Sequence, residues 1–447
     1  MCNPKKIYPS LAKFFHLCYT KGKHSFFSQM NLSRAKQQKG GFRMAKPVIY
    51  HIDVNSAFLS WEAEHRLHDL GETVDIREIP AIIGGDKEAR HGIVLAKSTL
   101  AKQCGILTGE PIVKALQKCP NLYIAKPNHS LYLERSRAFI ELLRRYSPIV
   151  EQFSIDEAFC DMTGTEGLYG DLISFAHKIK DEVRNELGFT VNVGISVNRL
   201  LAKTASDFKK PDLVHTLFPE ELPEKFWPLP VEDLLYVGHS TAERLRALGI
   251  RTIGDLAHID KEILISHFKK QGIFLHEAAN GIDTAIVTDE PSASNSYGNS
   301  TTLSADIVNG AEAERILLAL CEKVGSRIRK DRAYVSMVSV TIKDTELKSR
   351  SRQGQLSAPD NTTEQLYTTA RKLFYELWDG SPIRLLGVST GHVTDDACFQ
   401  YDLFDTGRRE KLSKLNAAVD EIRGKFGSSA LKRACFLDNE PNLGRKE

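Results

Sequence analysis

Apolar residues recur along the chain with two periods, and from residue 46 to about residue 208 these periods alternate. Short, nearly continuous apolar segments are typical of buried strands, and apolar residues spaced three and four apart predict amphipathic helices. Elements in this order predict an α+β fold, a mixed sheet with helices on one face. We expect strands over 46–54, 74–83, 92–98, 121–127, 153–162 and 189–197, and helices over 57–70, 99–104, 130–146, 172–187 and 198–208.

Two adjacent carboxylates interrupt one of the apolar segments, FSIDEAFCD at 153–161. The segment is expected to form a buried strand or a tight hairpin, and neighbouring side chains of a strand point to opposite faces. Burying Asp156 and Glu157 unpaired would cost several kcal/mol or force a large pKa shift, and a bound divalent cation offsets that cost. A third acid, Asp53, lies at the end of segment 46–54. We therefore expect these three carboxylates to converge on metal ions.

The pattern changes after Pro211, and a connector rich in proline and glutamate occupies 218–230. Residues 231–259 predict two short helices around a turn at 237–239, with a second glycine turn at 248–249. Gly238 would permit a tight turn whose backbone N–H groups face outward, which makes a sequence-independent phosphate site. This is the pattern of a helix-hairpin-helix, although an ordinary helical hairpin fits these residues alone equally well.

A second module follows a Ser/Asn/Pro/Gly linker at 289–299. It is expected to contain helices over 312–330 and 364–378 and strands over 334–344 and 383–393, with one polar face. Its basic residues indicate either a solvated surface or a nucleic-acid surface, and alternation with the polar side of a strand favours nucleic acid. These residues are Lys323, Arg327, Arg329, Lys330, Arg332, Lys343, Lys348, Arg350 and Arg352.

Composition is that of a globular chain of two to four domains, with 447 residues, 42% hydrophobic and 26% charged. The net charge of +3 is too small to indicate nucleic acid by itself. No apolar run approaches the roughly 20 residues that a membrane helix needs. The 8 cysteines are scattered without CxxC pairs, which favours reduced cysteines in a cytoplasmic protein over a zinc site.

The first 43 residues are basic and contain no acid. They could be a disordered arm that touches nucleic acid, an organelle-targeting segment, or residues upstream of the true start codon. We favour the third interpretation because Met44 lies where the folded part is expected to begin.

Five motifs together resemble the Y family of translesion DNA polymerases, in the branch of bacterial polymerase IV and UmuC, from Lys46 to about Lys432. The motifs are HIDVNSAF, VLAKSTLAKQCGI, FSIDEAFCD, VGISVNRLLAKTASDFKKPD and VGHSTAERL. The resemblance implies a right-hand polymerase with a ferredoxin-like palm, small fingers, a helix-hairpin-helix thumb and a little-finger domain. The implied domains are an N-terminal extension (1–43), palm (46–56 and 128–217), fingers (57–127), thumb (218–288), linker (289–299), little finger (300–399) and a tail with a clamp-binding motif (400–447).

The resemblance also implies template-directed, low-fidelity addition of dNTPs to a primer 3′ end, in translesion synthesis and DNA repair. Such a reaction uses two Mg²⁺ ions, which prefer carboxylate and phosphate oxygens. Asp53 and Asp156 would bridge both ions, Glu157 would hold the catalytic ion, and the backbone carbonyl of Val54 would be a further ligand.

Other roles are carried over residue by residue. Phe58 takes the position of the steric gate against ribose, although a core aromatic residue at a helix start would look the same. Lys102, Lys210, Thr99 and Ser98 take positions near the triphosphate, but Lys102 stands where arginine is common and Thr99 where tyrosine is usual. Ala57 replaces a common aromatic residue beside the gate. DNA contacts are expected from Gly238, Lys343, Lys348, Arg350 and Arg352.

The segment FQYDLFD contains Gln400, Leu403 and Phe404, which match the short pattern of proteins that bind the bacterial sliding clamp. Primer-template DNA, dNTPs and the clamp are thus the expected partners of a monomeric enzyme. An inactive DNA-binding accessory protein and a palm-type nucleotide cyclase are the alternatives. The complete set of carboxylates argues against the first, and the DNA-binding modules argue against the second.

Overall fold

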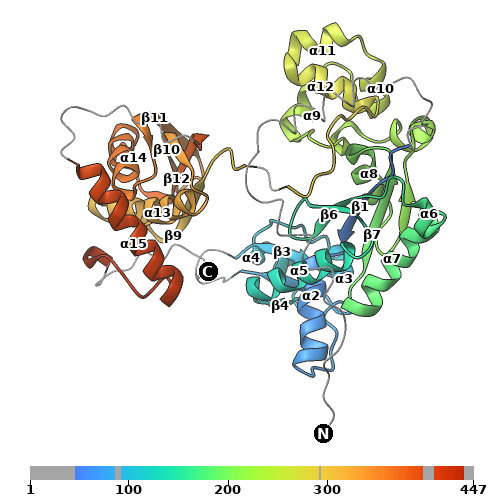
Figure 1. Ribbon diagram of the computed structural model, residues 1–447, viewed down its shortest axis with the longest axis horizontal. Helices are drawn as coiled ribbons and strands as arrows, with labels where there is room; N and C mark the ends of the chain where they lie inside the picture. Colours follow the sequence, from blue (N-terminus) through green and yellow to red (C-terminus); the bar gives the residue numbers. More distant parts are fainter. Residues whose placement is uncertain (1–45, 86–91, 291–292, 396–406, 437–447) are drawn as a thin grey trace, which may run out of the picture.

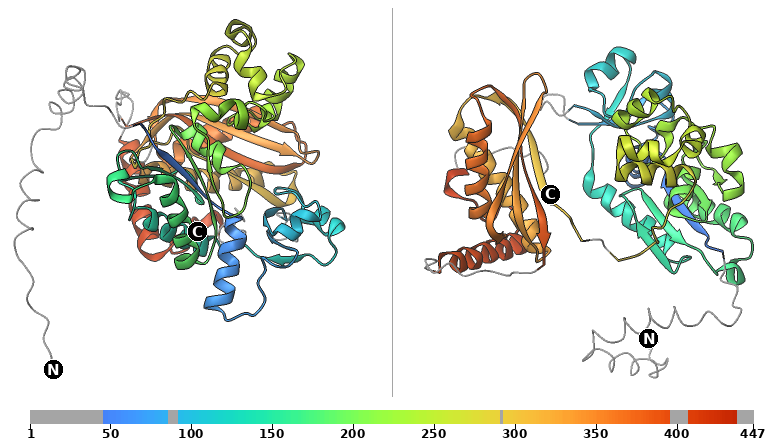
Figure 2. Two further views of the ribbon diagram at one scale, coloured as in Figure 1. Left: turned by 90° about the vertical axis from the view of Figure 1, so that its right-hand side faces the viewer. Right: turned by 90° about the horizontal axis from the view of Figure 1, so that it is seen from above.

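The computed structural model describes residues 46–85, 92–290, 293–395 and 407–436, and Figure 1 shows their arrangement. The palm and thumb form one part, and the C-terminal domain stands apart from them in Figure 1 and in the right-hand view of Figure 2. Gln400, Leu403 and Phe404 lie outside the described residues. Within those residues, no helix combines the length and the apolar character needed to cross a bilayer.

The palm is built on a five-stranded mixed sheet in the order β5-β6-β1-β7-β8. Only β7 and β8 are parallel among its paired strands. The strands are β1 (Ile49–Val54), β5 (Ile149–Gln152), β6 (Glu157–Asp161), β7 (Val191–Ser196) and β8 (Val214–Thr216), and the helices are α5 (His129–Leu143), α6 (Glu166–Tyr169), α7 (Leu172–Leu187) and α8 (Arg199–Ser206).

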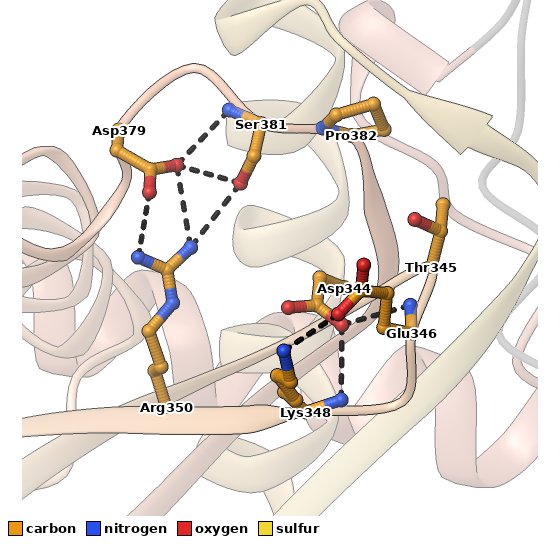
Figure 3. A pocket seen from close by; sticks show the side chains of 8 residues that line it. All are labelled: Asp344, Thr345, Glu346, Lys348, Arg350, Asp379, Ser381 and Pro382. Atoms are coloured by element: carbon orange, nitrogen blue, oxygen red, sulfur yellow. Dashed lines mark hydrogen bonds and ion pairs between the residues drawn. The ribbon is translucent and has the colours of Figure 1, made fainter.

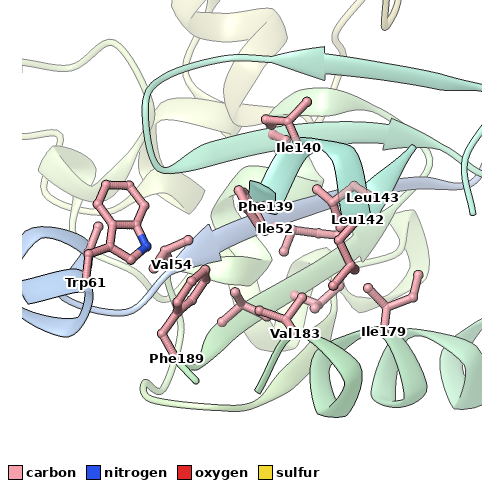
Figure 4. Packing of buried hydrophobic residues seen from close by; sticks show 14 of the residues in the cluster. Ile52, Val54, Trp61, Phe139, Ile140, Leu142, Leu143, Ile179, Val183 and Phe189 are labelled. Atoms are coloured by element: carbon pink, nitrogen blue, oxygen red, sulfur yellow. The ribbon is translucent and has the colours of Figure 1, made fainter. Parts of the chain in front are cut away.

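Helices cover both faces of the palm sheet, so the prediction of helices on one face is wrong. Ile52 and Val54 of β1 pack with α5 and α7 in the main core (Figure 4), which includes Phe139 and Val183. The alternate residues of β1 face α8 instead, because side chains of a strand alternate between faces. His51, for example, contacts Ser206 of α8.

Gly194 of β7 permits the close approach of α8. A Cβ at this position would lie 2.0 Å from the carbonyl oxygen of Ala202 and 2.3 Å from the backbone nitrogen of Ser206. Since Gly194 is paired with His51 in register, the helix crosses directly over the strand that ends in the candidate metal ligands.

The fingers contain a three-stranded sheet in the order β3-β2-β4. The expected strand over 74–83 is reduced to its last part, and residues 76–80 form turns and bends before it. The elements are α2 (Ala57–Glu64), the π-helical turn η1 (His65–Asp69), β2 (Ala81–Gly84), β3 (Val94–Lys97), α3 (Thr99–Gln103), α4 (Ile112–Lys118) and β4 (Tyr123–Ala125).

The thumb is helical and packs around Phe226, Leu245, Ile253 and Leu275. Its first predicted helix is only a 3₁₀ turn, η4, so α9 and α10 are the pair that flanks a glycine turn, at Gly249 with φ 84°. The elements are η2 (Pro219–Glu221), η3 (Leu222–Phe226), η4 (Val231–Asp233), α9 (His239–Ala247), α10 (Ile253–His258), α11 (Lys261–Phe268) and α12 (Lys270–Ala279).

The C-terminal domain has a four-stranded antiparallel sheet in the order β11-β10-β12-β9, with α13 and α14 on one face. Helix α15 is attached by ion pairs such as Arg329–Asp420 at 2.6 Å. The elements are β9 (Gly298–Ile307), α13 (Gly310–Lys330), β10 (Tyr334–Asp344), β11 (Ser349–Asp360), α14 (Thr363–Leu377), β12 (Ile383–Thr394), α15 (Arg408–Phe426) and the 3₁₀ turn η5 (Ala434–Phe436).

The chain between thumb and C-terminal domain is anchored at both ends. Val287 is buried against Ile49 and Phe159 of the palm, and the backbone nitrogen of Thr288 donates to Glu151 at 3.2 Å. At the other end, the backbone nitrogen of Tyr297 donates to the hydroxyl of Thr390 on β12 at 3.2 Å.

Candidate active site

Backbone pairing brings the three predicted carboxylates to one edge of the palm sheet. Asp53 of β1 lies opposite Glu157 of β6 in register. The backbone nitrogen of Val54 donates to the carbonyl of Asp156 at 3.0 Å, which fixes the turn before β6 beside the end of β1. The hydroxyl of Ser154 donates to the Asp156 carboxylate at 2.6 Å. The fold therefore brings the three residues to one place, and their convergence on metal ions stays a prediction.

Two lysines neutralise this edge in the structure. Lys210 forms an ion pair with Asp53 and another with Asp207, the latter at 2.9 Å. Lys203 of α8 donates to Oε2 of Glu157 at 2.8 Å. The first contact involves a residue that the family motif indicated, whereas Lys203 was not predicted. Its place seven residues before Lys210, on the helix after β7, was the available signal.

His51 is a second residue that sequence reasoning missed, and it lies behind Glu157. The hydroxyl of Ser206 donates to the carbonyl of Lys203 at 2.7 Å, so its oxygen accepts from Nδ1 of His51 at 2.7 Å. Nε2 of His51 is then the nitrogen that faces Oε2 of Glu157, at 3.6 Å. That distance is too long for a hydrogen bond, and Nε2 has no hydrogen-bond partner in the described part of the structure. The alternation of His51 with Asp53 on one strand was the signal for it.

Asn192 organises the loop that carries Lys210. It is fully buried and pairs in register with Asp53. Its amide nitrogen donates to the carbonyls of Ser206 at 3.2 Å and Lys209 at 2.9 Å. One buried amide thus ties the end of α8 and the following loop to the strand beside the carboxylates.

Burial and charge act differently on the two acids. Burial raises the pKa of Asp53 to about 6, although the ammonium of Lys210 acts in the opposite direction. Burial also disfavours the ionised form of Glu157, but the contacts with His51 and Lys203 outweigh it and lower the pKa of Glu157 to about 2. The pKa of Glu157 therefore lies below its usual range, and the pKa of Asp53 lies above it. A further cation near Asp53 would stabilise its ionised form.

The donor set fits a hard divalent cation. Carboxylate oxygens are the ligands that Mg²⁺ prefers. Among the residues that the structure describes, no group of three or more His, Cys, Asp or Glu side chains already has metal-binding geometry. In the described structure, the ammonium groups of Lys203 and Lys210 each contact one of the carboxylates.

Phe58 lies on the first turn of α2, next to the carboxylate edge in the sequence. The helix begins after Ser56, which has a left-handed φ of 49°. The Phe58 ring is half-buried and stacks on Tyr132 of α5, with centroids 4.7 Å apart and planes 9° apart. Phe58 therefore both packs on the palm and keeps part of its ring accessible.

The residues of the fingers predicted to contact the nucleotide differ in exposure. Ser98 is 2% exposed, and its hydroxyl donates to the carbonyl of Ile79 at 2.7 Å. The same oxygen accepts from the backbone nitrogens of Ala81 and Ala101, each at 3.1 Å. Ser98 is thus a helix cap whose hydroxyl is committed to backbone, and we no longer assign it to the nucleotide. Thr99 and Lys102 are exposed on α3.

Gly238 is exposed at the start of α9, but its backbone does not use the freedom of glycine. Its φ is −81°, and the left-handed residue of this turn is Tyr236, with φ 72°. A Cβ at Gly238 would meet nothing within 4 Å. Gly238 leaves open space at the start of α9. The expectation that its conformational freedom permits the tight turn is wrong, because Tyr236 adopts the left-handed conformation.

The basic residues of the C-terminal domain do not share one face. Arg350 and Arg352 pair in register with Ile342 and Val340, which are buried under the helices. Paired residues lie on the same side of a sheet, so both arginines point toward the helix side. Arg350 binds Asp379 at 2.7 Å (Figure 3), and Arg352 binds Glu376 at 2.6 Å.

The opposite, open face of this sheet is polar. Lys343 belongs to it, while Lys348 lies in the β10–β11 turn and pairs with Glu346 at 2.6 Å. The expectation that all four basic residues follow the polar side of a strand is therefore wrong for Arg350 and Arg352. The open face carries Ser339, Thr341, Lys343, Ser349, Ser351, Gln353, Gly387, Ser389, Gly298 and Ser300.

Comparisons with known proteins agree with this architecture. The impB/mucB/samB family matches residues 52–207 and its C-terminal domain matches residues 294–403, while the thumb domain of DNA polymerase-iota matches residues 232–283. DNA polymerase IV of Clostridium acetobutylicum is 42% identical over 394 residues, which cover 88% of this chain and 99% of that protein. DNA polymerase IV of Acetivibrio thermocellus is 38% identical over 399 residues, covering 88% of this chain and 98% of that protein.

The fold has a solved counterpart as well. A Y-family DNA polymerase chimera superposes with a TM-score of 0.66 at 22% identity, covering 78% of this chain and 100% of that one. Palm, thumb and C-terminal sheet together define an enzyme of nucleotide transfer. The chain belongs to the polymerase IV group of the Y-family translesion DNA polymerases, which confirms the resemblance drawn from its motifs.

Proposed function

We propose that primer extension takes place at the carboxylate edge of the palm, with Asp53, Asp156, Glu157 and the backbone carbonyl of Val54 holding two Mg²⁺ ions. The observation that supports this most is the register of β1 and β6, which puts Asp53 opposite Glu157 with Asp156 fixed next to them. When bound, such ions activate the attacking hydroxyl and neutralise the pyrophosphate.

Lys210 and Lys102 serve the triphosphate in this proposal. Lys210 already contacts Asp53, and its side chain is 34% exposed. An incoming anionic triphosphate would offer its ammonium a new partner if a cation took its place on the acid. Lys102 presents a single ammonium from the last turn of α3, three residues after Thr99. A lysine binds phosphate as a point charge, without the two-pronged grip of arginine.

The DNA-binding surfaces are proposed to be the start of α9, at Gly238, and the open face of the C-terminal sheet around Lys343. Exposed N–H groups at a helix start attract phosphate. The serine, threonine and glutamine side chains of the open face can donate to phosphate and sugar oxygens without reading sequence. Lys348 lies at the rim of this face, whereas Arg350 and Arg352 would reach DNA only from the outer edge of β11.

The central test is primer extension with Mg²⁺ and dNTPs by the full chain and by Asp156→Ala. We expect templated extension by the wild type, and loss of at least about 10³-fold in rate for the variant. Retained binding of the variant to primer-template DNA is the control that it folds. A wild type that binds DNA without extending it would favour the accessory role, and a cyclic nucleotide product without template would favour the cyclase.

We further propose that Gln400, Leu403 and Phe404 bind the bacterial sliding clamp and that the enzyme works as a cytoplasmic monomer. A short apolar plug that fills a pocket is a common mode of peptide recognition. Clamp pull-down with Leu403 and Phe404 both changed to alanine tests the first part, and undiminished capture would contradict it.

A further inference from the structure

The carboxylate of Glu157 is held from one side by α8. Lys203 reaches Oε2 at 2.8 Å, and its side chain is only 12% exposed. The same ammonium lies 5.2 Å from the ring centroid of Phe153, which precedes the turn that carries Asp156. Lys203 is therefore confined between the acid and an aromatic face, and it is not a freely solvated surface lysine.

A second residue of α8 fixes the histidine that lies beside the same carboxylate. Lys203 and Ser206 lie three residues apart, and such residues share one side of a helix. Ser206 holds His51 at 2.7 Å, and His51 faces the same Oε2 atom that Lys203 binds. His51 lies 3.6 Å from this oxygen without a hydrogen bond to it. The hydrogen bond from Lys203 is therefore the contact of α8 that orients the carboxylate.

A lysine in this place acts on a metal ligand in two opposite ways. Its hydrogen bond restrains the carboxylate, and residues that restrain a ligand improve a metal site. Its charge, however, repels any cation that approaches the same oxygen, and at a partly buried edge this repulsion is screened less than in water.

We propose that Lys203 is a positioning residue for Glu157 and that its ammonium competes with the divalent ion for this carboxylate. The proposal rests on the proposed role of Glu157 as a metal ligand. Lys203 would keep the edge neutral and ordered before nucleotide and metal arrive together, at the cost of weaker metal binding by the free enzyme.

The test measures Mn²⁺ binding to the full chain without DNA or dNTP, from the electron paramagnetic resonance signal of free Mn²⁺, alongside primer extension. Lys203→Met removes the charge and the hydrogen bond. We expect it to bind Mn²⁺ at least about 3-fold tighter and to lose at least about 10-fold in kcat. Lys203→Arg keeps the charge and should stay within about twofold of the wild-type affinity.

Two further variants separate charge from folding. Lys203→Gln removes the charge but can still donate to Glu157, so Mn²⁺ binding should tighten while kcat falls less than in Lys203→Met. Lys180→Met is the matched control, because Lys180 is also a buried lysine of the palm, 6% exposed and paired with Asp212 at 3.0 Å. It should change neither Mn²⁺ affinity nor the metal dependence of extension.

Unchanged Mn²⁺ affinity in both neutral variants would overturn the proposal and leave Lys203 as a support for α8. Equal tightening in Lys180→Met would overturn it as well, since the effect would then follow from net charge alone. A wild type that binds Mn²⁺ but does not extend a primer would contradict the proposed function and not this inference, so the two failures are distinguishable.

Discussion

Phe58 shows how one side chain can satisfy two demands. Its ring stacks on Tyr132, which is fully buried, and this contact is what a core aromatic residue at a helix start would make. The ring also remains partly exposed beside the strand end that carries Asp53. The two interpretations of Phe58 are therefore compatible, and the packing would hold a steric gate in a fixed place.

Replacing Phe58 with alanine should admit ribonucleotides, because the ring is the group expected to clash with a 2′ hydroxyl. We expect the preference for dNTP over rNTP, measured as a ratio of kcat/KM values, to fall by at least about tenfold. The rate with dNTPs serves as the internal reference for general damage. A preference equal to that of the wild type would leave Phe58 with a packing role alone.

The three carboxylates could be predicted from the sequence because acids inside apolar segments need a reason to be there. Ser98 could not be judged in the same way, since its position in the motif fits both a nucleotide contact and a helix cap. Only the three backbone partners of its hydroxyl decide between them. Lys203 and His51 were missed because their roles depend on which strand lies under α8, and this is a property of the register.

Among the elements, helix α8 packs closely on the palm sheet and needs a residue without a side chain beneath it. Its distance from the sheet depends on Gly194, which has no side chain. The helix carries Lys203, which donates to Glu157, and Ser206, which binds His51. Gly194 therefore matters for both packing and the site, because it lets α8 lie where Lys203 reaches Glu157.

Gly194→Ala should displace α8 and weaken both fold and activity. The added methyl would lie 2.0 Å from a backbone carbonyl, so either the helix or the strand must move. Overpacking of this kind costs about 1–3 kcal/mol or more. Urea unfolding measures the stability, and Mn²⁺ binding reports the site. Gly424→Ala on the exposed part of α15, where a Cβ meets nothing within 4 Å, is the matched control.

Elements with a clear apolar period were predictable, and elements without one were not. Helix α7 matches its predicted range of 172–187, because Asp171 caps its start with a bond to Ser174 at 2.8 Å and Gly188 ends it with φ 73°. Strands β5 and β8 and helix α4 were missed, since each is too short to show a period. Strands β9 and β11 were missed although they are long, because most of their residues are polar. Without β11, its register with β10 could not be used to place Arg350 and Arg352 on the helix side.

At the scale of the whole molecule, the proposed DNA interface uses the open face of the C-terminal sheet and not the side that the helices cover. Ser351 and Arg352 are neighbours on β11 that point to opposite sides. Ser351→Glu should weaken binding to primer-template DNA by about tenfold at low salt, because it puts a negative charge on the open face. Arg352→Gln should change it by less than about threefold, since this arginine is paired with Glu376.

Fluorescence anisotropy with labelled DNA over a range of salt concentrations measures both variants. The effect of Ser351→Glu should shrink as salt rises, as expected for a charge effect. A larger loss for Arg352→Gln than for Ser351→Glu would show that DNA uses the edge of β11 and not the open face.

The anchored connection between thumb and C-terminal domain limits how far the two parts can separate. From Thr288, held on the palm, to Tyr297, held on β12, the chain has about nine residues, which extend at most to ~30 Å. A tether this short keeps the second domain at a local concentration on the order of millimolar relative to the palm. Once one domain holds the duplex, the other rebinds faster than the enzyme diffuses away. Weak contacts on each part that do not depend on sequence are then sufficient for a long residence time on DNA. Lengthening the tether would shorten that residence time without changing any contact.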